Sequence, residues 1–79
     1  MSSSYATRFG KRVRAVREDA GLSQEGLADA AGLHRTHVSL IERGQRSCRL
    51  ETVEALAKAL RVQPAELMPS VRLRTSRRG

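Results

Sequence analysis

The sequence GLSQEGLADAAGLHRTHVSLIERGQR, residues 21–46, contains two short amphipathic segments separated by a glycine. Ser23 is a favourable N-cap and Gly32 a favourable C-terminal stop for a helix over residues 24–31. A second helix is expected over residues 35–43, and the turn between the two is only three residues long. Two helices joined by so short a turn are typical of a helix-turn-helix unit.

The second of these helices is predicted to have one apolar side and one polar side. At about 100° per residue, Val38 and Ile41 fall together on the apolar side, which we expect to face the first helix of the unit. The residues expected to point away from the protein are Arg35, Thr36, Ser39, Leu40 and Arg43. An arginine can donate two hydrogen bonds to guanine, and a threonine offers a hydroxyl and a methyl group, so this side suits the major groove of DNA.

Helical spacing of apolar residues predicts three further helices. The apolar stripe expected near the N-terminus is Phe9, Val13, Val16 and Ala20. The stripe expected after the helix-turn-helix unit is Leu50, Val53, Leu56, Ala57 and Leu60. A brief last helix is expected to begin at Pro64, because proline is well tolerated in a first helical turn. No strand-like alternation occurs in residues 1–68, so the predicted fold is an all-α bundle of five short helices.

Composition limits the classes of function. The chain has 79 residues, enough for one small domain, and its 15 Lys+Arg against 8 Asp+Glu give a net charge of +7. Such a surplus indicates a polyanionic partner, either a nucleic acid or an anionic membrane surface. Aromatic residues make up only 3% of the chain, which argues against the base-stacking surfaces of many RNA-binding domains. No apolar run is long enough to span a membrane and no signal peptide is recognisable, so we expect no membrane association.

Residues that could carry catalysis or hold a metal are not arranged for either purpose. The sequence shows no paired carboxylates, no nucleophile with a neighbouring base and no glycine-rich phosphate loop, so an enzyme is not expected. His34, His37 and Cys48 lack the number and spacing of zinc ligands, and we expect no metal or cofactor. A single cysteine cannot form an intramolecular disulfide, which is typical of the reducing cytoplasm. No set of residues indicates a small-molecule ligand.

The last eleven residues, 69–79, differ in composition from the rest of the chain. They hold four arginines and no acidic residue: Arg72, Arg74, Arg77 and Arg78. Together with proline, serine and glycine, this composition predicts a flexible basic tail that follows the folded domain of residues 1–68. The alternative is an ordered arm, because Val71 and Leu73 alternate with arginines as in a short strand.

The segments GLSQE, residues 21–25, and IERG, residues 41–44, resemble the helix-turn-helix family of the Cro and phage-repressor (XRE) type, whose fold is lambda-repressor-like. HRT, VS and ERGQR, within residues 34–46, are similar to the controller proteins of bacterial restriction–modification systems. The resemblance covers about residues 9–68. It implies a homodimeric transcriptional regulator that binds a pseudo-palindromic double-stranded DNA operator in the bacterial cytoplasm, where it is associated with the nucleoid. It further implies control of a restriction–modification operon, with RNA polymerase as a conceivable partner.

The same resemblance assigns roles to individual residues. Gln24 matches a phosphate-contacting glutamine at a helix N-terminus, and Arg35 and Thr36 match positions that read base edges. Arg43 and Arg46 match positions near the flanking DNA backbone. The whole set expected at the DNA is Ser23, Gln24, His34, Arg35, Thr36, His37, Ser39, Leu40, Arg43 and Arg46. His34 is also expected to act as an N-cap.

Two further expectations follow from the family pattern, and two positions depart from it. Arg17 and Glu42 are expected to form a structural ion pair. Controllers often have tyrosine at the position of His37, and the loop at residues 47–49 lacks the usual asparagine and Ser/Thr cap. The expected dimer contacts, from the last two helices, are Leu56, Val62, Leu67 and Met68, with burial inside the monomer as the alternative.

Three alternative functions suit the same sequence. The first is a general phage-type or host repressor, which would lack neighbouring endonuclease and methyltransferase genes. The second is an antitoxin-like interaction protein whose tail contacts a toxin. The third is a non-specific RNA or ribosome binder, which competition between unrelated DNA and RNA would reveal.

Overall fold

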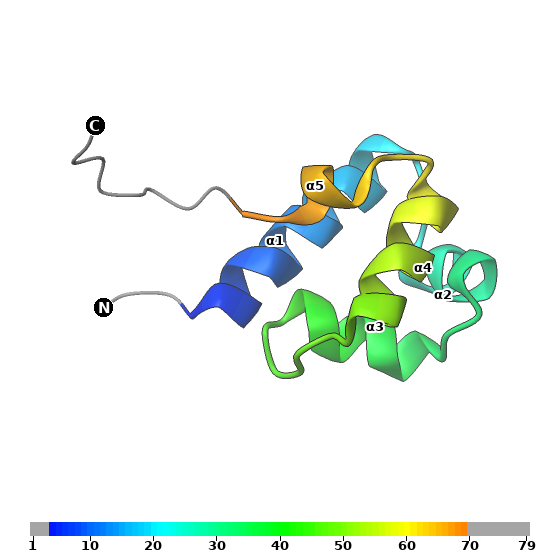
Figure 1. The fold of residues 1–79 in the computed structure, drawn as a ribbon. Helices are drawn as coiled ribbons and strands as arrows, with labels where there is room; N and C mark the ends of the chain where they lie inside the picture. The colour runs from blue at the N-terminus through cyan, green and yellow to red at the C-terminus, as the bar shows by residue number, and fades with distance from the viewer. Residues whose placement is uncertain (1–3, 70–79) are drawn as a thin grey trace, which may run out of the picture.

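The computed structural model describes residues 4–69. Its elements are α1 (Tyr5–Asp19), α2 (Gln24–Ala31), α3 (Arg35–Glu42), α4 (Leu50–Leu60) and α5 (Pro64–Leu67). No strand occurs among residues 4–69, so the predicted all-α bundle of five helices is confirmed (Figure 1). The predicted tail, residues 69–79, and its alternative, an ordered arm, lie outside the described residues except for Pro69.

Local sequence accounts for the ends of the helices. The hydroxyl of Ser4 accepts a hydrogen bond from the amide of Thr7 at the start of α1, and Ser23 Oγ accepts one from the amide of Gly26 at 2.9 Å at the start of α2. Gly32 ends α2 with φ +71°, a left-handed conformation that glycine adopts without a steric penalty. These signals explain why the positions of α2 and α3 could be predicted closely.

The core is formed at the crossing of the helices and is aliphatic except for Phe9. Its fully buried large side chains are Val13, Leu27, Val38, Ile41, Leu56 and Leu67. In Figure 1, α1 lies beside α5, α4 lies beside α2, and α3 runs along the lower edge of the bundle, where α1 and α2 both pack on it. The back of α3 is therefore anchored on two sides, and its outer side is left free. None of the helices in the described part of the chain combines the length and apolarity needed to cross a membrane.

Three residues of the predicted apolar stripes do not lie in the core. Ala20 is exposed and Val16 is only partly buried, because the buried side of α1 continues from Val13 to Arg17. Leu50 is 80% exposed, since it is the first residue of α4 and no neighbouring element covers it. Val16 still packs against the edge of the core, in agreement with the predicted stripe. The places of Ala20 and Leu50 on the apolar sides were wrong, although the helices beside or around them were predicted correctly.

A glycine permits the close crossing of α1 and α3. A Cβ atom at Gly10 would overlap the carbonyl oxygen of Ile41 and would lie 2.8 Å from the carbonyl oxygen of Glu42. Both obstacles are backbone atoms, which cannot rotate away as a side chain can. The role of Gly10 could not be predicted from the sequence, because a glycine in an amphipathic helix does not show by itself which element packs against it.

Candidate nucleic-acid interface

The outer side of α3 carries the polar residues that the sequence placed there. Arg35, Thr36 and Arg43 are exposed, whereas Ser39 and Leu40 are partly buried. Val38 and Ile41, on the opposite side, are completely buried. The predicted division of this helix into a core side and an outer side is therefore confirmed.

A shallow polar hollow joins this side of α3 to the start of α2. It is lined by Gln24, Arg35, Thr36, Ser39 and Arg43. All five residues belong to the set expected at the DNA, and the two helices of the helix-turn-helix unit bring them together from positions up to 19 apart in the chain, 43 − 24. Two guanidinium groups beside hydroxyl and amide groups form a surface that can donate hydrogen bonds to phosphate and to base edges.

The predicted ion pair between Arg17 and Glu42 is present and buried. Arg17 Nε donates to Glu42 Oε2 at 2.6 Å, and Arg17 Nη2 donates to Glu42 Oε1 at 3.1 Å. Arg17 Nη1 also donates to the backbone carbonyl oxygen of Leu22 at 2.7 Å. The hydrogen bond to Glu42 raises the pKa of Arg17, against the opposing effect of burial, so the guanidinium remains charged. This one side chain ties α1 to the turn before α2 and to the end of α3.

Gln24 takes part in the same network, which the sequence did not predict. Its Nε2 donates to Glu42 Oε1 at 3.1 Å, from a partly buried position at the start of α2. One N–H of the Gln24 side-chain amide is thus occupied by the Glu42 carboxylate. The carbonyl oxygen and the second N–H of that amide are not used by this bond. The glutamine expected at phosphate is positioned by the carboxylate of the structural ion pair.

His34 caps α3, as the sequence predicted. The amide of Thr36 donates to Nδ1 of the exposed His34 ring at 3.2 Å. Of the other expected DNA-contacting residues, which do not line the hollow, Ser23 and Arg46 are exposed, and His37 and Leu40 are partly buried. Arg43 is held only loosely, by a bond of 3.5 Å from its Nε to the carbonyl oxygen of Ser39.

Cys48 is a half-buried thiol in the loop between α3 and α4. Burial raises its pKa, and the nearby charge of Arg46 lowers it by a smaller amount. The group therefore remains a neutral thiol at ordinary pH, which disfavours metal binding and oxidation. Within residues 4–69 no cluster of three or more His, Cys, Asp and Glu side chains could hold a metal ion.

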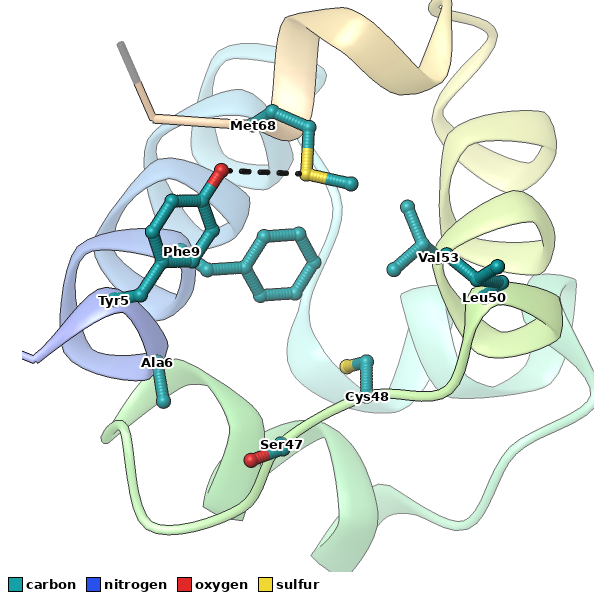
Figure 2. Close-up of a pocket in the computed structure, with 8 residues that line it drawn as sticks. All are labelled: Tyr5, Ala6, Phe9, Ser47, Cys48, Leu50, Val53 and Met68. Atoms are coloured by element: carbon teal, nitrogen blue, oxygen red, sulfur yellow. Dashed lines mark hydrogen bonds between the residues drawn. The ribbon is translucent and has the colours of Figure 1, made fainter. Parts of the chain in front are cut away.

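An apolar groove lies between α1 and the start of α4 (Figure 2), and none of its lining residues lines the polar hollow. Its lining residues are Tyr5, Ala6, Phe9, Ser47, Cys48, Leu50, Val53 and Met68. Tyr5 Oη donates to Met68 Sδ at 3.8 Å across one side of it, and Tyr5 is 43% exposed. Leu50 and Tyr5, the two large hydrophobic residues of the described chain that are exposed, both line this groove.

Comparison with known proteins agrees with this arrangement. Residues 8–68 match the model of a family described as helix-turn-helix domain. The control protein C.BamHI of Bacillus amyloliquefaciens is 44% identical over 69 residues, which cover 86% of this chain and 85% of that protein. The chain belongs to the helix-turn-helix family of controller proteins. The resemblance seen in the sequence is therefore confirmed.

Solved structures of controllers share the fold. The restriction–modification controller protein C.AhdI of Aeromonas hydrophila superposes with a TM-score of 0.79 at 46% identity, covering 80% of this chain and 96% of that chain. The controller C.Esp1396I, solved as a tetramer in complex with its natural 35 base-pair operator, has a TM-score of 0.76 at 29% identity, covering 84% of this chain and 87% of that one. The match to the family model ends at Met68, so residues 69–79 lie outside it.

Proposed function

We propose that this controller is a sequence-specific DNA-binding regulator of transcription, with the outer side of α3 placed in the major groove. The observation that carries the proposal is the polar hollow, which unites Gln24 of α2 with Arg35 and Thr36 of α3. Arg35 and Thr36 read base edges in this proposal, Ser39 and Leu40 contact the groove beside them, and the remaining expected residues contact phosphates. The relatives named above support the further proposal that the regulated genes belong to a restriction–modification system.

The proposed role requires only that the protein bind DNA and does not require catalysis. It places the protein with DNA in the bacterial cytoplasm. The net charge of +7 implies that phosphate neutralisation supplies much of the affinity. Binding is therefore expected to weaken steeply as salt concentration rises.

We further propose a homodimer that uses the apolar groove between α1 and α4. Leu56 and Leu67, which we expected at the dimer surface, are completely buried within the monomer and have no surface left for a partner, so that expectation was wrong. Val62 and Met68 remain partly exposed, and Met68 lines the groove together with Leu50 and Tyr5. An exposed apolar groove of this kind is typical of a surface that binds a protein.

Selection of bound sequences from random duplexes tests the proposed function. The wild type is expected to select a motif with two-fold symmetry, because a symmetric dimer presents two equivalent α3 helices. Arg35→Ala is expected to lose discrimination at one position of each half-site by about 1–3 kcal/mol, since the two hydrogen bonds to guanine disappear. Binding to the selected operator and to single-position variants measures the loss.

The position of Arg35 makes the result interpretable. Its side chain is exposed and makes no ion pair among the residues that the structure describes, so the variant is expected to keep the fold. Lys11→Ala, at an exposed position of α1 that also makes no ion pair among the described residues, serves as a charge control that lowers affinity for all sequences alike. If Arg35→Ala weakened operator and random DNA equally, the base-reading role would be wrong.

Leu50→Asp tests the dimer surface. Burial of this leucine on association is favourable by about 1.5–3 kcal/mol, and it occurs twice in a symmetric dimer, so the variant should raise the dimer dissociation constant by ~100-fold or more. Sedimentation equilibrium measures that constant. Ala15→Asp, at an exposed position of α1 outside the groove, is the control and should leave it unchanged. An unchanged constant for Leu50→Asp would assign dimerisation to another surface.

A further inference from the structure

The carboxylate of Glu42 accepts more hydrogen bonds than the ion pair with Arg17 requires. Its Oε2 accepts one from Arg17 Nε at 2.6 Å, and its Oε1 accepts one from Arg17 Nη2 and one from Gln24 Nε2, each at 3.1 Å. The Glu42 side chain is only 2% exposed, whereas Gln24 is partly buried and lines the polar hollow. The Gln24 amide therefore joins a buried anion to the surface proposed to meet DNA.

The bond to Glu42 limits the directions that the Gln24 amide can take. A side-chain amide carries two N–H donors on one nitrogen. One of them is held by Glu42, which does not itself line the hollow, so the other is left for the surface side. A free glutamine samples many rotamers, and fixing it on binding costs free energy. The anchored side chain is already ordered before DNA arrives.

The charge of Glu42 would be unfavourable at this place without Arg17. A carboxylate one amide group away from a phosphate repels that phosphate, and the repulsion is strong where water is excluded. Arg17 donates two hydrogen bonds and brings a full positive charge to the same carboxylate, so the pair is neutral as a whole. The pair can therefore anchor Gln24 without repelling DNA.

We propose that Glu42 is a positioning residue for DNA binding: it fixes the Gln24 amide so that the second N–H donates to one backbone phosphate. The proposal rests on the proposed function, in which Gln24 contacts phosphate. It makes DNA affinity depend on a buried residue that does not touch DNA. Because every nucleotide carries a phosphate, this contribution is the same for all sequences.

The first test uses the whole protein without DNA. In the nuclear magnetic resonance spectrum, one side-chain amide proton of Gln24 is expected to be shifted downfield by its bond to the carboxylate. Gln45, an exposed glutamine in the loop after α3, is the internal reference. Side-chain resonances of Gln24 that resemble those of Gln45 would overturn the proposal, whatever the protein does with DNA.

The second test separates positioning from stability by means of two variants. Arg17→Met with Glu42→Leu removes the anchor of Gln24 but leaves no unpaired buried charge. Its net charge stays at +7, because one positive and one negative residue are lost together. Glu42→Gln keeps the shape of the side chain but has one acceptor oxygen instead of two, so the three bonds that Glu42 accepts cannot all be kept. Circular dichroism establishes that each variant is folded.

The measurement replaces the phosphates of the selected operator one at a time by neutral methylphosphonates. At one phosphate of each half-site, this should weaken wild-type binding about fivefold and should leave binding by Gln24→Ala, which lacks the amide, unchanged. Arg17→Met with Glu42→Leu should be insensitive at that same phosphate, and Glu42→Gln should be less sensitive there than the wild type. Both variants should keep their sensitivity at the other phosphates and their discrimination at the base read by Arg35.

Arg14→Met with Glu18→Leu is the matched control, because it removes an exposed ion pair from α1 and also leaves the net charge unchanged. It should show the wild-type pattern. If folded variants without the Glu42 carboxylate kept full sensitivity at the phosphate that Gln24→Ala ignores, this proposal would be wrong and the proposed function would stand. If Gln24→Ala kept its sensitivity at every phosphate, the phosphate role of Gln24 in the proposed function would fail, and this proposal with it.

Discussion

Glu42→Ala is expected to lower the free energy of unfolding by about 3–5 kcal/mol, and the melting temperature by at least ~12 °C. The variant would leave the guanidinium of Arg17 buried without its carboxylate, and it would remove the acceptor of the Gln24 side chain. A domain of this length has a total stability of about 4–12 kcal/mol, so the loss takes a large share of it. Urea denaturation at neutral pH, monitored by helical circular dichroism, measures the change.

An exposed ion pair in the same protein provides the control. Arg14 Nε lies 3.1 Å from Glu18 Oε2 on α1, with both side chains more than half exposed. Glu18→Ala is expected to change stability by no more than about 0.5 kcal/mol, because water screens the pair. The double variant Arg17→Met with Glu42→Leu should recover much of the loss, since it leaves no unpaired buried charge. Equal effects of Glu42→Ala and Glu18→Ala would mean that the buried network contributes little.

Gly10→Ala is expected to destabilise the protein by about 3 kcal/mol, although alanine favours helices more than glycine does. The added methyl group would overlap the backbone carbonyl oxygen of Ile41, so α1 and α3 must move apart and lose contacts between their buried side chains. The same denaturation experiment measures this loss.

Gly26→Ala on α2 is the matched substitution. There a Cβ atom would lie 3.2 Å from Ser23 Oγ and 3.7 Å from Leu22 Cδ2, which are both side-chain atoms, and Ser23 Oγ need move only a few tenths of an ångström while it caps α2. The gain in helix propensity, up to about 1 kcal/mol, should offset that adjustment and leave stability nearly unchanged. If the two glycines tolerated alanine equally well, the close crossing of α1 and α3 would not be a constraint on the fold.

The features that could be predicted from the sequence are local ones or ones shared with the family. Caps and glycine stops are encoded within a few residues, so the positions of α2 and α3 were predictable from Ser23, Gly32 and His34. The pairing of Arg17 with Glu42 came from the family resemblance, and the structure shows the pair itself.

The features that the sequence did not predict depend on how other helices pack against the helix that contains them. Apolar spacing predicted that Leu50 and Leu56 share a side of α4, but only the packing of the neighbouring helices decides that one is exposed and the other completely buried. Gly10 was missed for the same reason, because its role is set by the carbonyl oxygens of α3 rather than by its own helix. The bond from Gln24 to Glu42 joins residues of two helices and has no signal in local sequence.

The free outer side of α3 has an evolutionary consequence. Arg35, Thr36 and Ser39 have no part in the core, whereas Val38, Ile41 and Glu42 on the same helix hold the scaffold together. New operator preferences can therefore arise by substitution at the first three positions with little loss of stability. The same separation makes this small protein a practical starting point for engineered regulators retargeted to chosen promoters.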